Sequence, residues 1–302
     1  MTDIARHEVT EPAPATVPVC DVGRLLIRCP DRSGIVAAVT TFLANAGANI
    51  ISLDQYSTEP VGGKFFQRTV FHLPGLVAAR ENLKLEFAAE VAAPLDMEFT
   101  LTEAAKPKRV AIMVSKSEHC LLDLLWRQRR GDLEMCISLV ISNHPTLAPE
   151  VRAFGVPYIH IPVRKDSRPE AEARQLELLR GNVDLVVLAR YMQIVSGRFL
   201  TEVGCPLINI HHSYLPAFVG ADPYKRARER GVKLVGATAH YVTQDLDDGP
   251  IIEQDVVRVN HQHTAADLVR LGADVERTVL ARAVRWHCED RVVLHGNTTI
   301  VF

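Results

Sequence analysis

The stretch from Pro206 to Gly220 reads P-L-I-N-I-H-H-S-Y-L-P-A-F-V-G, and the fold of the second half of the chain depends on it. Its apolar start, residues 206–210, predicts a short strand, and a turn rich in proline and glycine follows. Because side chains alternate across a strand, Asn209 and His211 face the same side. The sequence therefore predicts an amide and an imidazole side by side at the carboxyl end of a strand, where open α/β sheets place their ligands.

Strands and helices alternate along the chain from Arg109 onward. The pattern predicts strands over 110–114, 135–141, 156–161, 184–189, 206–210, 234–242 and 250–257, and helices over 119–130, 147–154, 168–180, 223–229 and 265–288. The helix over 119–130 is expected to bury its leucines together with Trp126. The run 184–189 is apolar almost throughout, as in a strand covered on both faces. Residues 109–302 are therefore expected to form a doubly wound, mostly parallel α/β domain with an antiparallel edge.

The first hundred residues follow a different order of elements. The pattern predicts a strand over 24–29, a helix from Ile35, strands over 49–58 and 64–73, a helix over 77–92 and a strand over 96–102. This βαββαβ order predicts a ferredoxin-like domain over 21–103. Residues 1–20 are polar and broken by prolines, so we expect a disordered tail there, and the charged segment 104–108 is expected to be a linker.

Composition argues against several classes of function. The chain has 302 residues, enough for about two domains, and its formal net charge of −2 argues against nucleic-acid binding. Its six cysteines form no C-x-x-C pair, which argues against a disulfide framework or a zinc knuckle. No apolar run approaches the ~20 residues that span a bilayer, and acids and prolines stand where a signal peptide has an apolar core. We therefore expect a cytoplasmic protein that binds neither nucleic acid nor a membrane.

The side chains suited to chemistry are Asn209, His211, His240 and Asp247. The chain contains no G-x-G-x-x-G, P-loop or G-x-S-x-G motif, so dinucleotide, nucleotide and serine-hydrolase sites are not indicated. A carboxylate beside an imidazole fixes its tautomer and favours its charged form. An amide beside both can donate to a developing oxyanion. The set suits attack on a carbonyl through a tetrahedral intermediate.

Each of these residues also has a structural interpretation. Asn209 could bond to a loop, and His240 could satisfy a buried hydrogen bond. His212 is interpreted as structural because its side chain should face away from His211. Asp245 and Asp248 are interpreted as turn formers. The combination of amide, imidazole and carboxylate at the strand ends of one sheet is what favours a catalytic site.

The segment C-P-D-R-S-G-I-V-A-A-V, 29–39, and the later A-N-I, 48–50, resemble an ACT domain. This resemblance implies pairing of sheets between subunits and binding of a small amino acid, such as glycine or methionine. The matching residues are Asp31, Gly34 and Asn49. We expect a homo-oligomer, a dimer or tetramer, formed through these domains. The alternatives are that Asp31 only caps a helix and that the domain serves only to oligomerise.

The segments 209–220 and G-A-T-A-H-Y-V-T-Q-D-L-D-D-G-P-I-I, 236–252, resemble the folate-dependent formyltransferases. The resemblance implies that Asn209, His211 and Asp247 act on the formyl group of 10-formyltetrahydrofolate, without a metal or other cofactor. It also implies that the segment L-A-R-Y-M-Q-I, 188–194, lines the folate pocket. The residues expected to contact the substrate are Met192, Gln193, Ile194, His240 and Gly220.

One departure from the family pattern bears on the formyl acceptor. Relatives that formylate glycinamide ribonucleotide carry a glycine-rich loop after the first strand of this domain, whose amides hold the substrate phosphate. The matching loop, Lys116–His119, lacks glycine, and Glu118 would repel a phosphate. Together with the ACT domain and the C-terminal G-N-T-T-I-V-F, this resembles the branch that hydrolyses 10-formyltetrahydrofolate to tetrahydrofolate and formate, supplying formate for purine biosynthesis and balancing one-carbon pools.

Three alternatives stay open at this stage. The first is a formyltransferase with an unidentified amine acceptor. The second is a zinc hydrolase that uses His211, His212 or His240 with Asp247, which the absence of an H-E-x-x-H motif disfavours. The third is an amino-acid sensor that binds folate without turnover. Two further residues, Ser33 and Asp222, depart from the family pattern without touching the expected chemistry.

Overall fold

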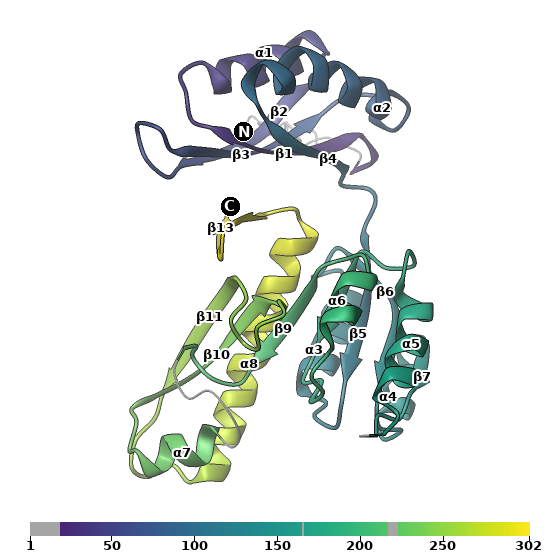
Figure 1. The fold of residues 1–302 in the computed structure, drawn as a ribbon, viewed down its shortest axis with the longest axis vertical. Coiled ribbons are helices and arrows are strands. Elements are labelled where there is room, and N and C mark those ends of the chain that lie inside the picture. The colour runs from purple at the N-terminus through teal and green to yellow at the C-terminus, as the bar shows by residue number, and fades with distance from the viewer. Residues whose placement is uncertain (1–18, 165, 217–222) are drawn as a thin grey trace, which may run out of the picture. The chain divides into compact units, whose positions relative to one another are not determined.

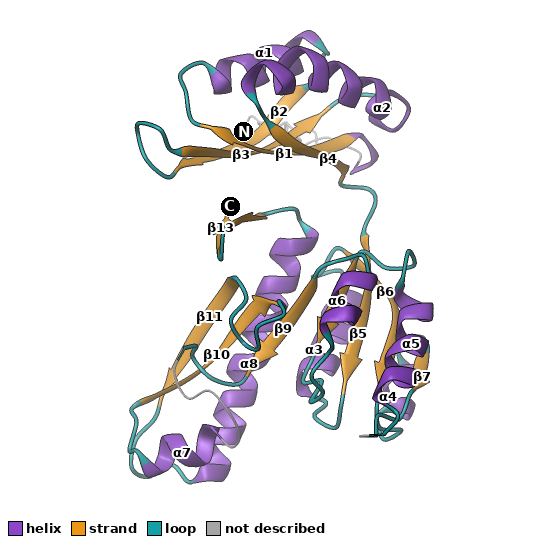
Figure 2. Cartoon of the chain, viewed as in Figure 1, coloured by secondary structure: helices purple, strands orange, loops and turns teal. Residues whose placement is uncertain are grey.

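The computed structural model describes residues 19–164, 166–216 and 223–302. Contacts between Cα atoms divide the chain after Ala105 into two compact units, unit 1 (residues 1–105) and unit 2 (residues 106–302). Figure 1 follows the chain from unit 1, in purple and blue, into unit 2, in teal to yellow, and Figure 2 separates helices from strands.

Unit 1 is a four-stranded antiparallel sheet with two helices on one face (Figure 2). Its elements are β1 (Val22–Pro30), α1 (Ile35–Asn45), β2 (Asn49–Ser57), β3 (Lys64–His72), α2 (Leu76–Phe87) and β4 (Glu98–Glu103), with short helical turns at Val19–Asp21, Ala88–Ala92 and Ala93–Leu95. The strands neighbour one another in the order β2-β3-β1-β4. The predicted ferredoxin-like βαββαβ fold is confirmed.

The core of unit 1 lies between this sheet and its helices. Gly34 has a φ of +93° at the start of α1 and Gly47 has a φ of +82° after its end, a backbone region that favours glycine. Within the core the rings of Phe42 and Phe87 meet edge to face with centroids 5.2 Å apart. Burial of each such ring stabilises the fold by about 1.5–3 kcal/mol.

Unit 2 is built on a seven-stranded sheet (Figure 1). Its strands are β5 (Lys108–Val114), β6 (Met135–Ser142), β7 (Tyr158–His160), β8 (Leu185–Leu188), β9 (Leu207–His211), β10 (Leu234–Tyr241) and β11 (Ile251–Arg258). They lie in the order β11-β10-β9-β8-β5-β6-β7. The strands β9, β8, β5, β6 and β7 are parallel to one another. Strand β10 pairs antiparallel with both β9 and β11. The doubly wound, mostly parallel sheet with an antiparallel edge is confirmed.

Helices cover both faces of this sheet. They are α3 (His119–Arg129), α4 (Ala148–Ala153), α5 (Arg168–Leu179), α6 (Gly197–Glu202), α7 (Pro223–Glu229) and α8 (Ala265–Cys288). One apolar layer joins α3, α4 and α8 to the sheet, and a second joins α5 and α6 to the other face. Side chains of β9 go to both layers, with Ile208 and Ile210 in the first and Leu207 in the second. The chain crosses from one side of β5 to the other between β7 and β8, and such a switch point opens a crevice at the carboxyl ends of the strands.

Three features of unit 2 differ from the sequence prediction. Helix α6 and the C-terminal hairpin of β12 (Val292–His295) and β13 (Thr298–Val301) are not predicted. Trp126 is 51% exposed, so its predicted burial is wrong. The buried side chains of α3 include Leu121, Leu124 and Leu125, a spacing that defines one helix face and leaves residue 126 outside it.

Among the residues that the structure describes, no helix combines the length and the apolar character needed to cross a membrane.

Candidate active site

A cavity of about 850 Å³ opens at the carboxyl ends of β8 and β9. Its walls also include residues of β10, of the loop between β10 and β11, and of helices α3, α7 and α8. Of the residues predicted from the sequence, the lining includes Asn209, His211, His240, Asp247, Met192, Gln193 and Ile194. Gly220 and Asp222 lie outside the described residues.

The pairing of β9 with β10 brings Asn209 and His240 together. The two residues are directly opposite in the antiparallel register, so their side chains lie on the same face. Nδ2 of Asn209 and Nε2 of His240 are 3.2 Å apart. The register of β10 against β11 shifts between Ala239 and His240, and such irregularities re-aim side chains beside sites.

The hydrogen bonds of His240 define its tautomer. Its Nδ1 is 2.9 Å from the carbonyl oxygen of Tyr241, so Nδ1 carries the hydrogen and donates it. Burial lowers the pKa of His240, which favours the neutral ring. Nε2 is then an acceptor, and the Asn209 amide donates to it. This bond orients the amide and leaves its second N–H for a ligand.

The carboxylate of Asp247 lies beside both histidines. Its Oδ1 is 3.2 Å from Nδ1 of His211 and 3.9 Å from Nε2 of His240. The hydrogen bond from His211 lowers the pKa of Asp247, so the carboxylate is ionised at neutral pH. His211 donates through Nδ1, and within the described part of the chain no partner contacts its buried Nε2. That nitrogen is the free hydrogen-bonding position of the site.

The loop between β10 and β11 holds Asp247 in place. Asp247 has a φ of +57°, a left-handed conformation that aspartate adopts more readily than most residues. Two residues later, a Cβ on Gly249 would lie 1.8 Å from the carbonyl oxygen of Tyr241. Only glycine allows this close approach. The tight turn therefore returns Asp247 to the ends of the strands.

Ser115, directly after β5, fixes the segment that contains Met192. Its hydroxyl accepts a hydrogen bond from the Met192 amide (2.9 Å) and donates one to Oδ1 of Asn143 (2.8 Å). Its own amide donates to the carbonyl of Arg190 (3.2 Å). Ser115 is 3% exposed, so these bonds are shielded from water. One residue at the switch point thus joins the ends of β5, β6 and β8.

Comparisons with known proteins show the family to which each part of the chain belongs. Residues 108–284 match the Formyl transferase family and residues 23–84 match the ACT domain family. The formyltetrahydrofolate deformylase of Mycobacterium bovis is 70% identical over 282 residues, covering 93% of this chain and 91% of that protein. The chain belongs to the formyltetrahydrofolate deformylase family.

Two further relatives extend this result. The formyltetrahydrofolate deformylase of Bacillus subtilis is 53% identical over 283 residues, which cover 93% of this chain and 94% of the relative. The crystal structure of a formyltetrahydrofolate deformylase from Pseudomonas syringae pv. tomato superposes with a TM-score of 0.87 at 46% identity. That match covers 93% of this chain and 94% of the solved chain.

The residues predicted to bind an effector lie in the ACT domain of this deformylase-family chain. Asp31 and Gly34 follow the end of β1, and α1 has no side-chain cap at its start, so Asp31 does not cap it. Asn49 begins β2 and is opposite His72, whereas Pro30, at the end of β1, is opposite Lys64. Asn49 therefore lies at the other end of the sheet, and one copy of the chain does not bring the three residues into a single site.

A second polar cluster lines the same cavity, and no sequence motif predicts it. It consists of His119, Arg190, Tyr224 and Glu276, called the Glu276 network below. Glu276 is 2% exposed and accepts hydrogen bonds from Tyr224 Oη (2.7 Å) and His119 Nε2 (2.8 Å). Nε of Arg190 is 3.5 Å from the same carboxylate. Burial raises the pKa of Glu276, but His119, Arg190 and Tyr224 outweigh it and hold the pKa below its usual value.

His212 connects the two polar clusters, which corrects the prediction that its side chain faces away from His211. Strand β9 ends at His211, so the alternation of a strand does not extend to the next residue. The two imidazoles stack with centroids 5.2 Å apart and an interplanar angle of 26°. The other side of His212 faces Tyr224 at 6.1 Å. Burial, with the charge of Arg190, lowers the pKa of His212 to about 4, so this ring is neutral.

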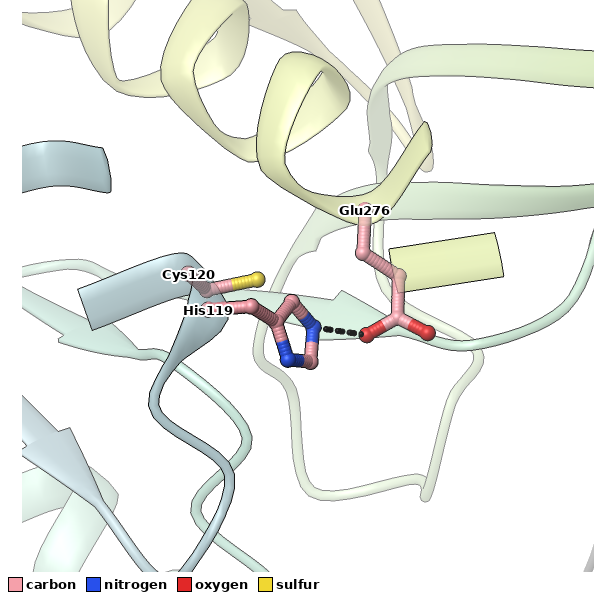
Figure 3. Close-up of side chains that lie close together, drawn as sticks. All are labelled: His119, Cys120 and Glu276. Atoms are coloured by element: carbon pink, nitrogen blue, oxygen red, sulfur yellow. Dashed lines mark hydrogen bonds and ion pairs between the residues drawn. The ribbon is translucent and has the colours of Figure 1, made fainter. Parts of the chain in front are cut away.

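His119, Cys120 and Glu276 form a group that could in principle hold a metal ion (Figure 3). Figure 3 shows Glu276 reaching from α8 toward the first turn of α3, where the imidazole and the thiol lie. Their donor atoms are all within 4.8 Å of one another. Glu276 is already bonded to Tyr224 and lies near Arg190, and that cation disfavours a second positive charge. The arrangement fits an internal ion-pair network better than a metal centre.

Proposed function

We propose that this chain hydrolyses 10-formyltetrahydrofolate to tetrahydrofolate and formate at Asn209, His211 and Asp247. The observation that carries the proposal is the convergence of an amide, an imidazole and an ionised carboxylate in one cavity. The chain's membership of the formyltetrahydrofolate deformylase family supports the choice of substrate. The ionised carboxylate of Asp247 can take the proton that water loses as it attacks, and membership of the deformylase family supports water as the nucleophile.

The proposed mechanism assigns one task to each residue. Asp247 holds the water and takes its proton while the oxygen bonds to the formyl carbon. Protonated His211, through Nε2, and the second N–H of Asn209 donate to the oxyanion that develops on the formyl oxygen. The bond from carbon to N10 then breaks, and N10 receives the proton through the carboxylate. His240 is a positioning residue, because its neutral ring orients the Asn209 amide.

Exposed apolar side chains of the cavity lining suit the flat, largely apolar body of a folate. Met192, Ile194 and Leu246 line the cavity and are 56%, 57% and 63% exposed. Exposed apolar side chains around a cavity are typical of a ligand site. The cavity volume of about 850 Å³ lies within the range of about 300–1,000 Å³ for small-molecule sites. We assign Met192, Gln193 and Ile194 to folate binding.

The remaining parts of the proposal concern regulation and setting. The ACT domain is proposed to bind an amino acid such as glycine or methionine through Asp31, Gly34 and Asn49. Because these residues lie at opposite ends of one sheet, a site containing all three requires a second copy of the chain. We propose a cytoplasmic homo-oligomer formed through ACT domains, with no metal or other cofactor in the reaction.

A formate-release assay tests the proposal. Purified protein with 10-formyltetrahydrofolate, in the presence of a chelator and without any amine, is expected to yield equal amounts of formate and tetrahydrofolate. Repeating the assay with glycine or methionine tests the effector assignment. Turnover that requires an added amine would instead support the formyltransferase alternative, and loss of turnover with the chelator would support a metal site.

A further inference from the structure

We propose that the Glu276 network (His119, Arg190, Tyr224 and Glu276) forms a wall that closes the side of the cavity from which a formyl acceptor would approach, so that water enters and an amine does not. The inference rests on the proposed function and identifies residues that decide between hydrolysis and formyl transfer. The network lines the same cavity as the catalytic residues, and His212, which stacks on His211, lies with its ring centroid 6.1 Å from that of Tyr224 of the network. It therefore borders the place from which a nucleophile reaches the formyl carbon.

The carboxylate of Glu276 is fully engaged inside the network. Both carboxylate oxygens of Glu276 are engaged, Oε1 with Tyr224 and Oε2 with His119 and Arg190. Nε and Nη1 of Arg190 are covered by protein atoms, so no ligand can reach them, although no hydrogen-bond partner contacts them among the described residues. A binding site presents free donors and acceptors. The network therefore offers neither the Glu276 carboxylate nor these two nitrogens to an amine or to an anionic group attached to it.

A glycine in α8 leaves the space that the network needs. Gly272 lies in the interior of α8, one turn before Glu276, where glycine costs about 0.5–1 kcal/mol relative to alanine. A Cβ at this position would lie 2.0 Å from Oη of Tyr224. The glycine therefore makes room for the tyrosine to reach the buried carboxylate. Contacts from α3, the loop after β8 and α7 converge on this one side chain of α8.

Formyl transfer to an amine, the reaction that the wall prevents, needs no reactant besides the amine and 10-formyltetrahydrofolate. An amine nitrogen would attack the formyl carbon, the bond from that carbon to N10 would break, and the amine would lose one proton to N10 through Asp247. The products would be tetrahydrofolate and an N-formyl amine in place of formate. Only the identity of the nucleophile differs, so opening the wall changes the partition between two products of the same site.

The test measures that partition in the full-length chain with 10-formyltetrahydrofolate and glycinamide as the probe amine. Formate, N-formylglycinamide and tetrahydrofolate are quantified for the unmodified chain and for His119→Ala and Tyr224→Ala, which open the wall from α3 and from α7. We expect formate alone from the unmodified chain. In the opened variants the transferred fraction should rise at least about tenfold, equivalent to about 1.4 kcal/mol in the difference between the two barriers.

Two controls separate the volume of the wall from other effects. Glu276→Gln keeps the side-chain volume and is expected to stay closed to glycinamide. Arg277→Ala changes the next residue of α8, whose side chain is 41% exposed and pairs with Asp274, and is expected to match the unmodified chain in both products. Circular dichroism and thermal unfolding establish that each variant is folded.

The proposal is overturned if the opened variants fold, release formate and form no N-formylglycinamide, or if the unmodified chain forms it. A measurement that needs no variant gives the same decision: glycinamide should leave the KM for 10-formyltetrahydrofolate and the rate of formate release of the unmodified chain unchanged. Competitive inhibition would show an open acceptor site and contradict the proposal. Absence of formate release from the unmodified chain would instead refute the proposed function itself.

Discussion

Two polar clusters line one cavity and differ in what they leave free. Around Asp247, the buried Nε2 of His211 has no partner in the described chain, and Asn209 keeps one N–H unused. Around Glu276, both carboxylate oxygens are occupied, and Nε and Nη1 of Arg190 are buried without a hydrogen-bond partner among the described residues. A buried polar atom without a partner destabilises the folded protein by about 1–3 kcal/mol, and a ligand that supplies the missing hydrogen bond removes this cost. Such atoms occur in both clusters, and the clusters differ in their carboxylates: both oxygens of Glu276 are engaged, whereas the contacts of Asp247 with the two histidines all go to its Oδ1.

The largest effect is expected from Asp247→Asn. The change removes the base that takes the proton of water and keeps the shape of the side chain. We expect kcat for formate release to fall by at least about 10²–10⁴, while the affinity for folate changes little. Steady-state kinetics with a folate-binding titration measure both quantities. Asp248→Asn, in the exposed neighbour, is the matched control and should retain activity. Full activity of Asp247→Asn would remove this residue from the mechanism.

Asn209→Ala is expected to have the next largest effect. It deletes the amide that His240 orients toward the oxyanion, and loss of one such donor lowers kcat by about 10²–10³. KM should change by much less, because the interaction strengthens as charge develops on the formyl oxygen. Kinetics at saturating and at low substrate separate the two parameters. A variant with raised KM and unchanged kcat would show that Asn209 binds substrate without acting on the oxyanion.

The proposed catalytic set could be identified as a candidate from the sequence because it lies in short segments with a regular geometry. Asn209 and His211 are two residues apart on a strand, and Asp247 lies in a loop whose glycine and aspartates indicate a tight turn. The Glu276 network has no such pattern. Its members come from α3, the loop after β8, α7 and α8, and only packing in three dimensions brings them together. A glycine in the interior of α8 is the one sequence signal for this cluster, and it becomes interpretable only through Tyr224.

The same distinction explains the other differences from the sequence prediction. The apolar strands and α8 follow from hydrophobic periodicity, and their limits are predicted to within a few residues. Helix α6 is six residues long, too short for periodicity to identify, although its N-cap Ser196 accepts a bond from the Phe199 amide. The side of His212 could not be predicted, because strand alternation ends at His211 and the stacking of the two rings is a tertiary contact.

A pH titration of stability tests the position of His212 between the two clusters. Its pKa is about 4 in the folded protein, against a usual value of 6.5, so between these values the unfolded chain binds the proton and the folded chain does not. Stability is unaffected by this group above pH 6.5 and decreases as pH falls toward 4, by about 3 kcal/mol in total. Urea unfolding at several pH values should therefore show a shallower decrease for His212→Gln. An identical decrease in both proteins would show that His212 is not held neutral.

The smallest effect is expected from Ser115→Ala. The change removes the acceptor of the Met192 amide and the donor to Asn143, and leaves the catalytic residues untouched. We expect the binding free energy of folate to weaken by about 1 kcal/mol, because the Met192 segment is held less firmly. KM should therefore rise by about tenfold or less, with little change in kcat. The kinetics of formate release give both values. A fall in kcat with KM unchanged would place the role of Ser115 in the chemical step and not in the folate-binding wall.

The most direct test of water as the nucleophile is hydrolysis in ¹⁸O-labelled water. We expect each molecule of formate to contain one oxygen atom from the solvent, because the water held by Asp247 forms the new bond to the formyl carbon. Mass spectrometry of formate from single-turnover reactions without any amine measures this directly. Incorporation of one labelled oxygen in step with tetrahydrofolate formation supports the account. Tetrahydrofolate formed without labelled formate, or no product until an amine is added, would contradict it.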